Sequence, residues 1–424
     1  MAGVRFVAGS GESSGASGMI RTISWLALAA ALVGACATTP RLNSPLASPR
    51  GASPVGFPSA IRTETSDVDF LKENAVSRSI ALAQASDRTV DLLALSGGGA
   101  GGAFGAGVLI GLTQAGTRPR FEMVTGVSTG ALIAPFAFLG PEWDDELRKA
   151  YAGEATGNLM QSRGVGALWD VGMFDGKPLR DLVARFVTDE LVAAVAKKAA
   201  GGRLLIVATT NLDREETVVW DMGAIAMQGG DKARDLFRNV LVASASVPGV
   251  FPPVMIEVEK DGQVYQEMHV DGGASTPFFV APEAIREIDT LSNSPRGANI
   301  YVIINGQSAS ASRTTSNNTI DIAARSFTSV LNHLTRSAIS QTANFARDNN
   351  MSFRFTAIPS DVQFGGSLAF ETPNMSETFI YGARCAAIGL VWVTRDQAAA
   401  RSANEDAALK PFAEAGCPLL APTR

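Results

Sequence analysis

The stretch TVDLLALSGGGAGGAFGAG, residues 89–107, indicates the fold class of this chain. Its first eight residues form a short apolar run, which is typical of a buried β-strand, and the glycines that follow predict a tight turn. From residue 103 the sequence continues as AFGAGVLIGLTQAG, with apolar residues at helical spacing and a glycine stop at Gly116. We therefore expect a strand, a glycine-rich turn and a helix, in that order.

The same alternation recurs along the chain. FEMVTGVS, residues 121–128, predicts a second strand and turn, and the apolar segment ALIAPFAFLG after it predicts a helix. Strands that alternate with helices predict an α/β fold with a mainly parallel central sheet, flanked by helices on both faces. Further strands are expected at 202–213, 216–222, 265–273 and 299–306, and further helices at 235–254, broken at Pro248, and at 320–347.

Composition excludes several classes of protein. The chain has 424 residues, of which 46% are apolar and 18% charged, so it can bury a large core and is neither disordered nor a coiled coil. A formal net charge of −5 without Lys/Arg-rich runs argues against nucleic-acid binding and against electrostatic docking on anionic lipid. Only two histidines are present, and the three cysteines lack zinc-finger spacing, so we expect no metal site.

The N-terminal part of the chain predicts where in the cell the protein is located. MIRTISWLALAAALVGAC, residues 19–36, has the basic residue, apolar run and small residues of a signal peptide, and it is too short for a membrane span. V-G-A-C resembles the bacterial lipobox, which predicts that Cys36 is lipidated; the alternative is an ordinary cleaved leader with a chance cysteine. Residues 1–18 do not resemble a leader, which favours Met19 as the true start. Ala37 after the cysteine favours the outer membrane over the inner one.

The chain divides into four segments by composition. Residues 1–36 are the expected signal peptide, and the Pro/Ser-rich residues 37–68 predict an extended tether. The α/β domain is expected over 85–395, followed by a C-terminal extension over 396–424. Cys385 and Cys417 would be able to pair in an oxidising compartment, although two buried thiols are an equally open alternative.

The glycine-rich turn, residues 96–107, is the first candidate functional motif. Gly97, Gly99 and Gly102 match G-x-G-x-x-G, but Glu122 lies at the start of the next strand, whereas a ribose-binding acid belongs at its end. No Walker lysine is present, which excludes a P-loop. Unhindered N–H groups at a helix N-terminus instead stabilise negative charge on a phosphate or a tetrahedral oxyanion. The alternative is a tight turn without a ligand.

The second motif is G-V-S-T-G, residues 126–130. Glycines on both sides of Ser128 allow a sharp turn between strand and helix, which would expose its hydroxyl as a nucleophile. The alternative is a serine that only caps the helix.

A serine nucleophile needs a base, and Asp271 in H-V-D-G-G-A is the best candidate because it ends a predicted strand before two glycines. Its alternative role is to support the turn. His269 would share its face of the strand and is a second candidate base. His333 lies in the middle of a predicted helix, where a partly buried structural histidine is the favoured interpretation.

These three motifs, in this order and with so few histidines, resemble those of the patatin-like phospholipases. The resemblance extends over about residues 89–395 and includes similar segments at 172–183, 211–220, 244–254 and 370–390. It implies a patatin-like α/β hydrolase fold in which a Ser–Asp dyad, here Ser128 and Asp271, replaces a triad. It also implies that the loop residues Gly97, Gly98 and Gly99 form the oxyanion hole. The family loop usually carries Arg or Lys two residues after its third glycine, where this chain has Gly101.

The implied activity is that of a serine acyl hydrolase acting on a phospholipid, lysophospholipid or other acyl ester through an acyl-enzyme, without a metal or other cofactor. The expected location is the bacterial cell envelope, with a lipid anchor in the outer membrane facing the periplasm. Two alternatives stay open: a non-catalytic lipid-binding lipoprotein of the same fold, and an esterase that uses His269 or His333 in a triad.

Overall fold

The computed structural model describes residues 48–64, 90–152, 174–280, 298–307, 314–317, 319–402 and 409–420. The expected signal peptide, Met19 and Cys36 lie outside these residues. None of the helices in the described ranges combines the length and apolarity that crossing a membrane requires.

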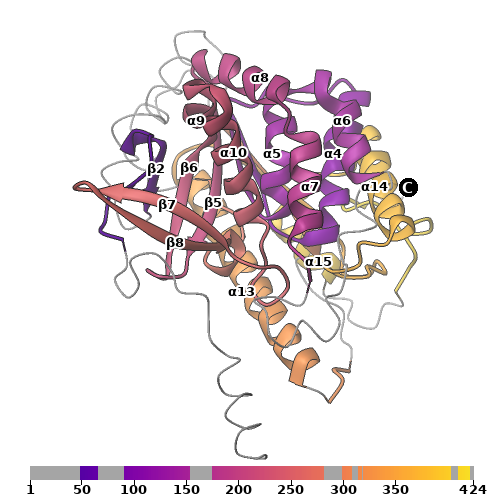
Figure 1. The fold of residues 1–424 in the computed structure, drawn as a ribbon. Helices are drawn as coiled ribbons and strands as arrows, with labels where there is room; N and C mark the ends of the chain where they lie inside the picture. The colour runs from indigo at the N-terminus through magenta and orange to yellow at the C-terminus, as the bar shows by residue number, and fades with distance from the viewer. Residues whose placement is uncertain are drawn as a thin grey trace, which may run out of the picture.

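A ten-stranded sheet forms the centre of the molecule (Figure 1), with the order β1-β7-β8-β5-β4-β3-β9-β10 and with β6 and β2 branching from β5. The strands are β1 (Ser53–Pro54), β2 (Arg62–Glu64), β3 (Val90–Leu95), β4 (Met123–Val127), β5 (Leu204–Asn211), β6 (Glu216–Asp221), β7 (Val254–Lys260), β8 (Gln263–Asp271), β9 (Ala298–Gln307) and β10 (Ser352–Ile358).

The pairing confirms the predicted fold class. The five strands β10, β9, β3, β4 and β5 are mutually parallel, and antiparallel strands extend the sheet beyond β5. The helices are α4 (Gly102–Gln114), α5 (Thr129–Leu139), α6 (Asp144–Tyr151), α7 (Lys177–Phe186), α8 (Asp189–Ala200), α9 (Met222–Gln228), α10 (Gly230–Ser244), α13 (Thr319–Asp348), α14 (Thr372–Ala387) and α15 (Arg395–Ser402).

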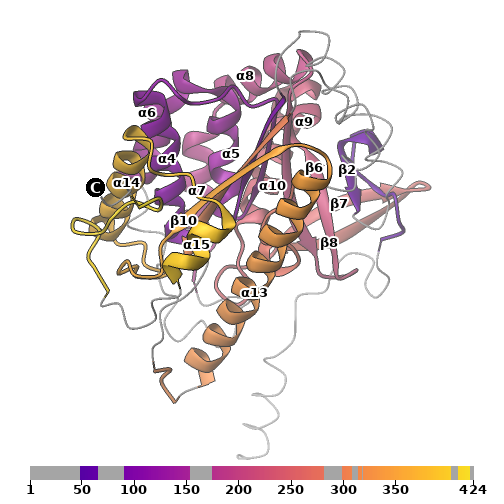
Figure 2. The same ribbon diagram turned by 180° about the vertical axis from the view of Figure 1, so that it is seen from behind.

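Helices cover both faces of the sheet, as Figures 1 and 2 show. Helices α4, α5, α10 and α14 pack on one face, whereas α13 and α15 lie on the other. Strand β3 explains why both faces bury apolar side chains: Leu93 and Leu95 enter one core cluster, and Leu92 and Ala94 enter the other. This alternation is the two-residue period of a strand covered on both sides.

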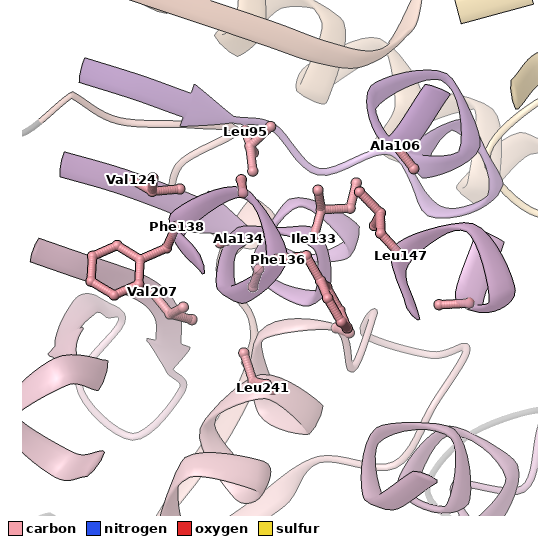
Figure 3. Packing of buried hydrophobic residues seen from close by; sticks show 14 of the residues in the cluster. Leu95, Ala106, Val124, Ile133, Ala134, Phe136, Phe138, Leu147, Val207 and Leu241 are labelled. Atoms are coloured by element: carbon pink, nitrogen blue, oxygen red, sulfur yellow. The ribbon is translucent and has the colours of Figure 1, made fainter. Parts of the chain in front are cut away.

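The larger core cluster surrounds α5 (Figure 3). Phe138 lies over Val124 of β4 and Val207 of β5, while Phe136 points toward Leu241 of α10. All five of these side chains are almost completely buried. Burial of such side chains contributes about 2–3 kcal/mol each, so α5, which follows Ser128 directly, is fixed firmly on the sheet.

The prediction that residues 37–68 form an extended tether is wrong for residues 48–64, the part that the structure describes. These residues form β1, which pairs with β7, and β2, which pairs with β6. Arg62 is buried and donates to the carboxylate of Glu267 on β8, with Nη2 and Oε1 3.0 Å apart. Composition suggested a tether because the segment contains few large apolar residues; a long-range ion pair and strand pairing hold it instead.

The C-terminal extension packs against the domain rather than apart from it. Cys385 on α14 and Cys417 form a disulfide with a Cα–Cα distance of 5.4 Å, which resolves the choice that the sequence left open. Phe412, Ala415 and Cys417 join the larger core cluster.

We expect the Cys385→Ala/Cys417→Ala variant to lose about 2–4 kcal/mol of unfolding free energy, because the disulfide closes a long loop in the unfolded chain. Urea denaturation under oxidising conditions measures the loss. Dithiothreitol should bring the wild type down to the variant and leave the variant unchanged. Equal midpoints of the two proteins without reductant would contradict a stabilising disulfide.

Candidate active site

The candidate site lies where β4, β5 and β8 carry their functional residues to one level of the sheet. Val127, the last residue of β4, pairs with Ala208 of β5, and Asp271, the last residue of β8, pairs with the next β5 residue, Thr209. Ser128 and Asp271 therefore reach the same level on the two sides of β5. The turn after β4 then brings the two side chains toward each other.

Ser128 occupies a strained turn between β4 and α5. Its φ of 56° and ψ of −127° lie in a region that residues other than glycine rarely adopt. The neighbouring Gly130 is required by close packing, since a Cβ atom there would lie 2.3 Å from the carbonyl oxygen of Leu95. The turn is thus built as the sequence predicted, with the serine at its sharpest point.

A hydrogen bond from α10 holds this strained turn. The backbone N–H of Ser128 donates to Oγ of Ser244 at 3.0 Å, and that hydroxyl donates to the carbonyl of Ala208 at 2.7 Å. Two residues later, the carbonyl of Ser246 accepts the N–H of Asp271 at 2.9 Å. The end of α10 therefore positions both Ser128 and Asp271.

Sequence analysis did not single out Ser244, although it lies in a segment, 244–254, that was noted for its family resemblance. A serine at a helix end has many local uses, and only the fold shows that this one contacts a turn 116 positions earlier.

Asp271 is almost fully buried. Its Oδ1 accepts the N–H of Gly273 at 2.7 Å. Burial raises the pKa of Asp271 to about 7, while hydrogen bonding with the Ser128 hydroxyl and the Gly273 amide opposes the rise. The Ser128 hydroxyl is thus close to the carboxylate, but Oδ2 has no hydrogen bond of ordinary geometry to any described residue.

The glycine loop borders the same space. A Cβ atom built on Gly97 would lie 3.1 Å from Cβ of Ser128. The N–H of Gly97 donates to the carbonyl of Pro277 at 3.1 Å, so this amide is already engaged. The amides of Gly98 and Gly99 donate to no described residue. Three amides were predicted to form the oxyanion hole. Of these, the amides of Gly98 and Gly99 can still stabilise an anion.

The fold gives a reason for the glycine at 101. A Cβ atom at this position would lie 2.2 Å from the carbonyl oxygen of Asn305. Asn305 is fully buried, and its side chain donates to the carbonyl of Ser96 while its own N–H donates to Oγ of Ser96. Because Asn305, held by its hydrogen bonds to Ser96, fills this space, the family's basic side chain has no room at position 101.

Neither histidine is hydrogen-bonded to Ser128 or Asp271 in the described structure. The ring nitrogens of buried His269 contact Thr209 at 2.9 Å and Glu267 at 3.0 Å. Burial lowers the pKa of His269, although the hydrogen bond with Glu267 opposes this. His333 is exposed on α13, so the prediction that it is partly buried is wrong. The described residues contain no cluster of His, Cys, Asp and Glu that would hold a metal ion.

The pKa of Asp271 generates a stability prediction. Its folded value of about 7 exceeds the ordinary 3.8, so the folded protein loses stability as pH rises from about 4 to 7, by on the order of 4 kcal/mol in total. Asp271→Asn removes this penalty. We expect its stability advantage over the wild type to grow by about 2 kcal/mol or more between pH 5 and pH 8, measured by urea denaturation.

Asp145→Asn, which removes a surface carboxylate from α6, controls for the change in net charge. An advantage of Asp271→Asn that stays constant between pH 5 and pH 8 would show that Asp271 does not titrate as proposed.

Comparison with known proteins found two similarities. Residues 93–282 match the family model of patatin-like phospholipases, a range that includes the glycine loop, Ser128 and Asp271. A crystal structure of VipD from Legionella pneumophila is similar at 13% identity and a TM-score of 0.36, covering 71% of this chain and 67% of that one. The chain matches no curated protein sequence. The chain therefore contains a patatin-like phospholipase domain over residues 93–282.

Proposed function

We propose that this protein is a serine lipid acyl hydrolase in which Ser128 is the nucleophile and Asp271 its base. The observation that carries the proposal is the pairing of a serine on a strained turn with a buried carboxylate whose pKa is raised to about 7. A buried carboxylate that lacks a cationic partner is destabilising, and such groups concentrate at functional sites.

The raised pKa solves the main chemical difficulty of a dyad without imidazole. An ordinary aspartate, with a pKa near 3.9, is too weak a base to accept the proton of a serine hydroxyl efficiently. At a pKa of about 7, Asp271 is ionised in a large fraction of molecules near neutral pH and yet binds a proton well. It can therefore act as base and acid in turn.

In the acylation step, Oγ of Ser128 attacks the ester carbonyl carbon while its proton moves to Oδ2 of Asp271. The carbonyl oxygen becomes an oxyanion, which the amides of Gly98 and Gly99 stabilise; loss of one such donor costs about 3 kcal/mol of barrier. The C–O bond to the alcohol then breaks, and Asp271 returns its proton to the departing alkoxide.

In the second half, water attacks the acyl-serine and gives a proton to Asp271. The second oxyanion collapses, the bond to Oγ breaks, and Asp271 protonates Ser128 again. The products are one alcohol and one carboxylic acid, and the residues regain their starting protonation states. The proposed substrates are phospholipids, lysophospholipids or other acyl esters, in keeping with the family to which the domain belongs.

We expect Ser128→Ala to lower kcat/KM on a fluorogenic acyl ester by at least about 10³-fold, because the nucleophile is lost. Asp271→Asn should cost about 10²–10⁴-fold, since an amide cannot accept the proton. Labelling with a fluorophosphonate probe, followed by peptide mapping, should modify Ser128 alone.

His333→Ala and His269→Gln serve as controls and should retain activity within a few-fold, provided that their thermal stability is unchanged. Equal turnover by the wild type, Ser128→Ala and Asp271→Asn would refute the dyad. Loss of activity on replacing one histidine in a folded protein would favour a triad esterase. No turnover and no probe labelling in any protein would favour a non-catalytic lipid-binding protein.

We also propose that Cys36 carries a lipid that anchors the protein in the bacterial outer membrane, facing the periplasm. The support is the signal-like sequence 19–36 with its V-G-A-C ending, followed by Ala37. A single acyl chain binds membranes only weakly, so stable anchoring needs further chains or contacts.

Metabolic labelling with radioactive palmitate in a bacterial host tests the anchor. The wild type should incorporate label and sediment with outer-membrane fragments, whereas Cys36→Ala should do neither. Cys417→Ala is the matched control and should label like the wild type. Label that persists in Cys36→Ala would refute the assignment.

A further inference from the structure

The β10–α14 loop, residues 359–371, contacts the glycine loop of the candidate site. The N–H of Ala100 donates to the carbonyl of Ser367 at 2.9 Å. Gly99 adopts a φ of 55°, and a Cβ atom at this position would lie 2.0 Å from the same carbonyl oxygen. Glycine alone fits there, and the position of its peptide depends on where Ser367 lies.

The C-terminal extension holds the first half of the β10–α14 loop. The N–H of Lys410 donates to the carbonyl of Asp361 at 2.9 Å, and the N–H of Gln363 donates to the carbonyl of Lys410 at 2.8 Å. Ser367 follows Gln363 by only four positions. A displacement of the held segment would therefore move the carbonyl that contacts the glycine loop.

Arg401, on α15, joins Asp361 to the end of the same extension. Its Nε donates to Oδ1 of Asp361 at 2.9 Å and its Nη2 to Oδ2 at 3.2 Å, so the two side chains form a paired contact. The guanidinium also donates to the carbonyls of Gly416 at 3.1 Å, Pro418 at 3.3 Å, and Cys417. The Arg401 side chain is only 8% exposed. One buried cation thus connects two segments of chain.

The disulfide fixes the carbonyls that Arg401 contacts. It joins Cys417 to Cys385 on α14, and α14 packs along α4, as both views show (Figures 1 and 2). A Cβ atom built on Gly107 of α4 would lie 2.1 Å from the carbonyl oxygen of Phe379 on α14. Because α4 begins directly after the glycine loop, Arg401 is anchored to the helix pair that supports this loop.

The residues of this arrangement lie outside the range that matches the family model, which ends at residue 282. The sequence also placed Arg401 in an extension beyond the expected domain, 85–395. The contacts connect that extension to the glycine loop through one ion pair and one hydrogen-bonded loop. The geometry of the candidate oxyanion hole therefore depends on residues beyond the matched domain.

We propose that Arg401 is a positioning residue for the oxyanion hole: through Asp361 it holds the β10–α14 loop, and this loop holds the amides of Gly98 and Gly99 in place. The inference rests on the proposed function, in which these two amides stabilise the oxyanion. Such donors act only if they are fixed at hydrogen-bond distance from the developing charge. Because the oxyanion forms in the transition state, a loosened loop lowers kcat and leaves KM unchanged.

Steady-state kinetics on a fluorogenic acyl ester test the proposal with three variants: Arg401→Gln, Asp361→Asn and the two combined. We expect each variant to lower kcat at least about tenfold, since a small misplacement of reacting groups has effects of this size, with KM within about twofold of the wild type. The double variant should match the single ones, because both residues act through one contact. It also leaves no unpaired buried charge, which protects its folding.

The pH dependence of kcat/KM separates loop positioning from damage to the dyad. Asp271 contacts none of the altered residues, so the pH of half-maximal kcat/KM should stay where the wild type has it. A variant that disturbed Ser128 or Asp271 would shift this pH.

Arg118→Gln is the matched control. Arg118 is also buried and pairs with a carboxylate, Asp144, at 2.5 Å, and it donates to the carbonyl of Phe136 at 3.2 Å. It lies after the other end of α4, away from the glycine loop. This variant loses comparable contacts and should keep kcat within about twofold of the wild type.

Amide hydrogen exchange gives a readout that does not require turnover. The peptide containing Ala100 should exchange at least about tenfold faster in Arg401→Gln than in the wild type, because the bond to Ser367 opens more often. In Arg118→Gln its exchange should be unchanged.

The proposal is overturned by an unchanged kcat in the folded Arg401 and Asp361 variants, by an equal loss in Arg118→Gln, or by a rise in KM or a shifted pH profile in place of the loss in kcat. A wild type without turnover would refute the hydrolase instead. In that case exchange at Ala100 decides the positioning role: faster exchange in Arg401→Gln supports it, and unchanged exchange rejects it.

Discussion

The desolvation of one carboxylate, Asp271, is the constraint on which the site depends. Strand β8 carries a second buried carboxylate, Glu267, only four residues earlier, and the two have opposite pKa shifts. Burial alone would raise the pKa of Glu267 too, but hydrogen bonds from His269 and Arg62 hold it well below its ordinary range. Among the described residues, the pKa of Asp271 is lowered only by hydrogen bonding with the Ser128 hydroxyl and the Gly273 amide, which are both uncharged. The contrast shows that ion pairing, not depth of burial, separates a structural carboxylate from one suited to proton transfer.

The ion pair of Glu267 belongs to a buried hydrogen-bond network that also includes His269 on β8. The network is complete when Nε2 of His269 donates to Glu267 and the Thr209 hydroxyl donates to Nδ1. The Thr209 oxygen in turn accepts the indole N–H of Trp220 at 2.8 Å. This arrangement uses both nitrogens of the imidazole closest in sequence to Asp271. His269 therefore supports the attachment of the N-terminal segment 48–64, through Glu267 and Arg62, and in the proposed mechanism Asp271 alone transfers the proton.

Sequence analysis predicted the parts of the structure that rest on local patterns. The strand–turn–helix units around Gly98 and Ser128 followed from apolar runs and glycines, and β3, α4, β4 and α5 formed where expected. The helix predicted over 235–254 begins earlier, at Gly230, and ends at Ser244, before Pro248. What the sequence did not predict depends on distant partners: the pairing of 48–64 with β6 and β7, the bond from Ser128 to Ser244, and the engagement of the Gly97 amide by Pro277.

A loop without a charged side chain at Gly101 is consistent with the raised pKa of Asp271. A cation held near a buried carboxylate favours its ionised form and lowers its pKa, as Arg62 does for Glu267. No charged group among the described residues contributes to the pKa of Asp271, and Asn305 leaves no space for a basic side chain at position 101. In the proposed mechanism the loop therefore supplies neutral donors, the amides of Gly98 and Gly99, which would stabilise a transient oxyanion without a permanent charge that would weaken the base.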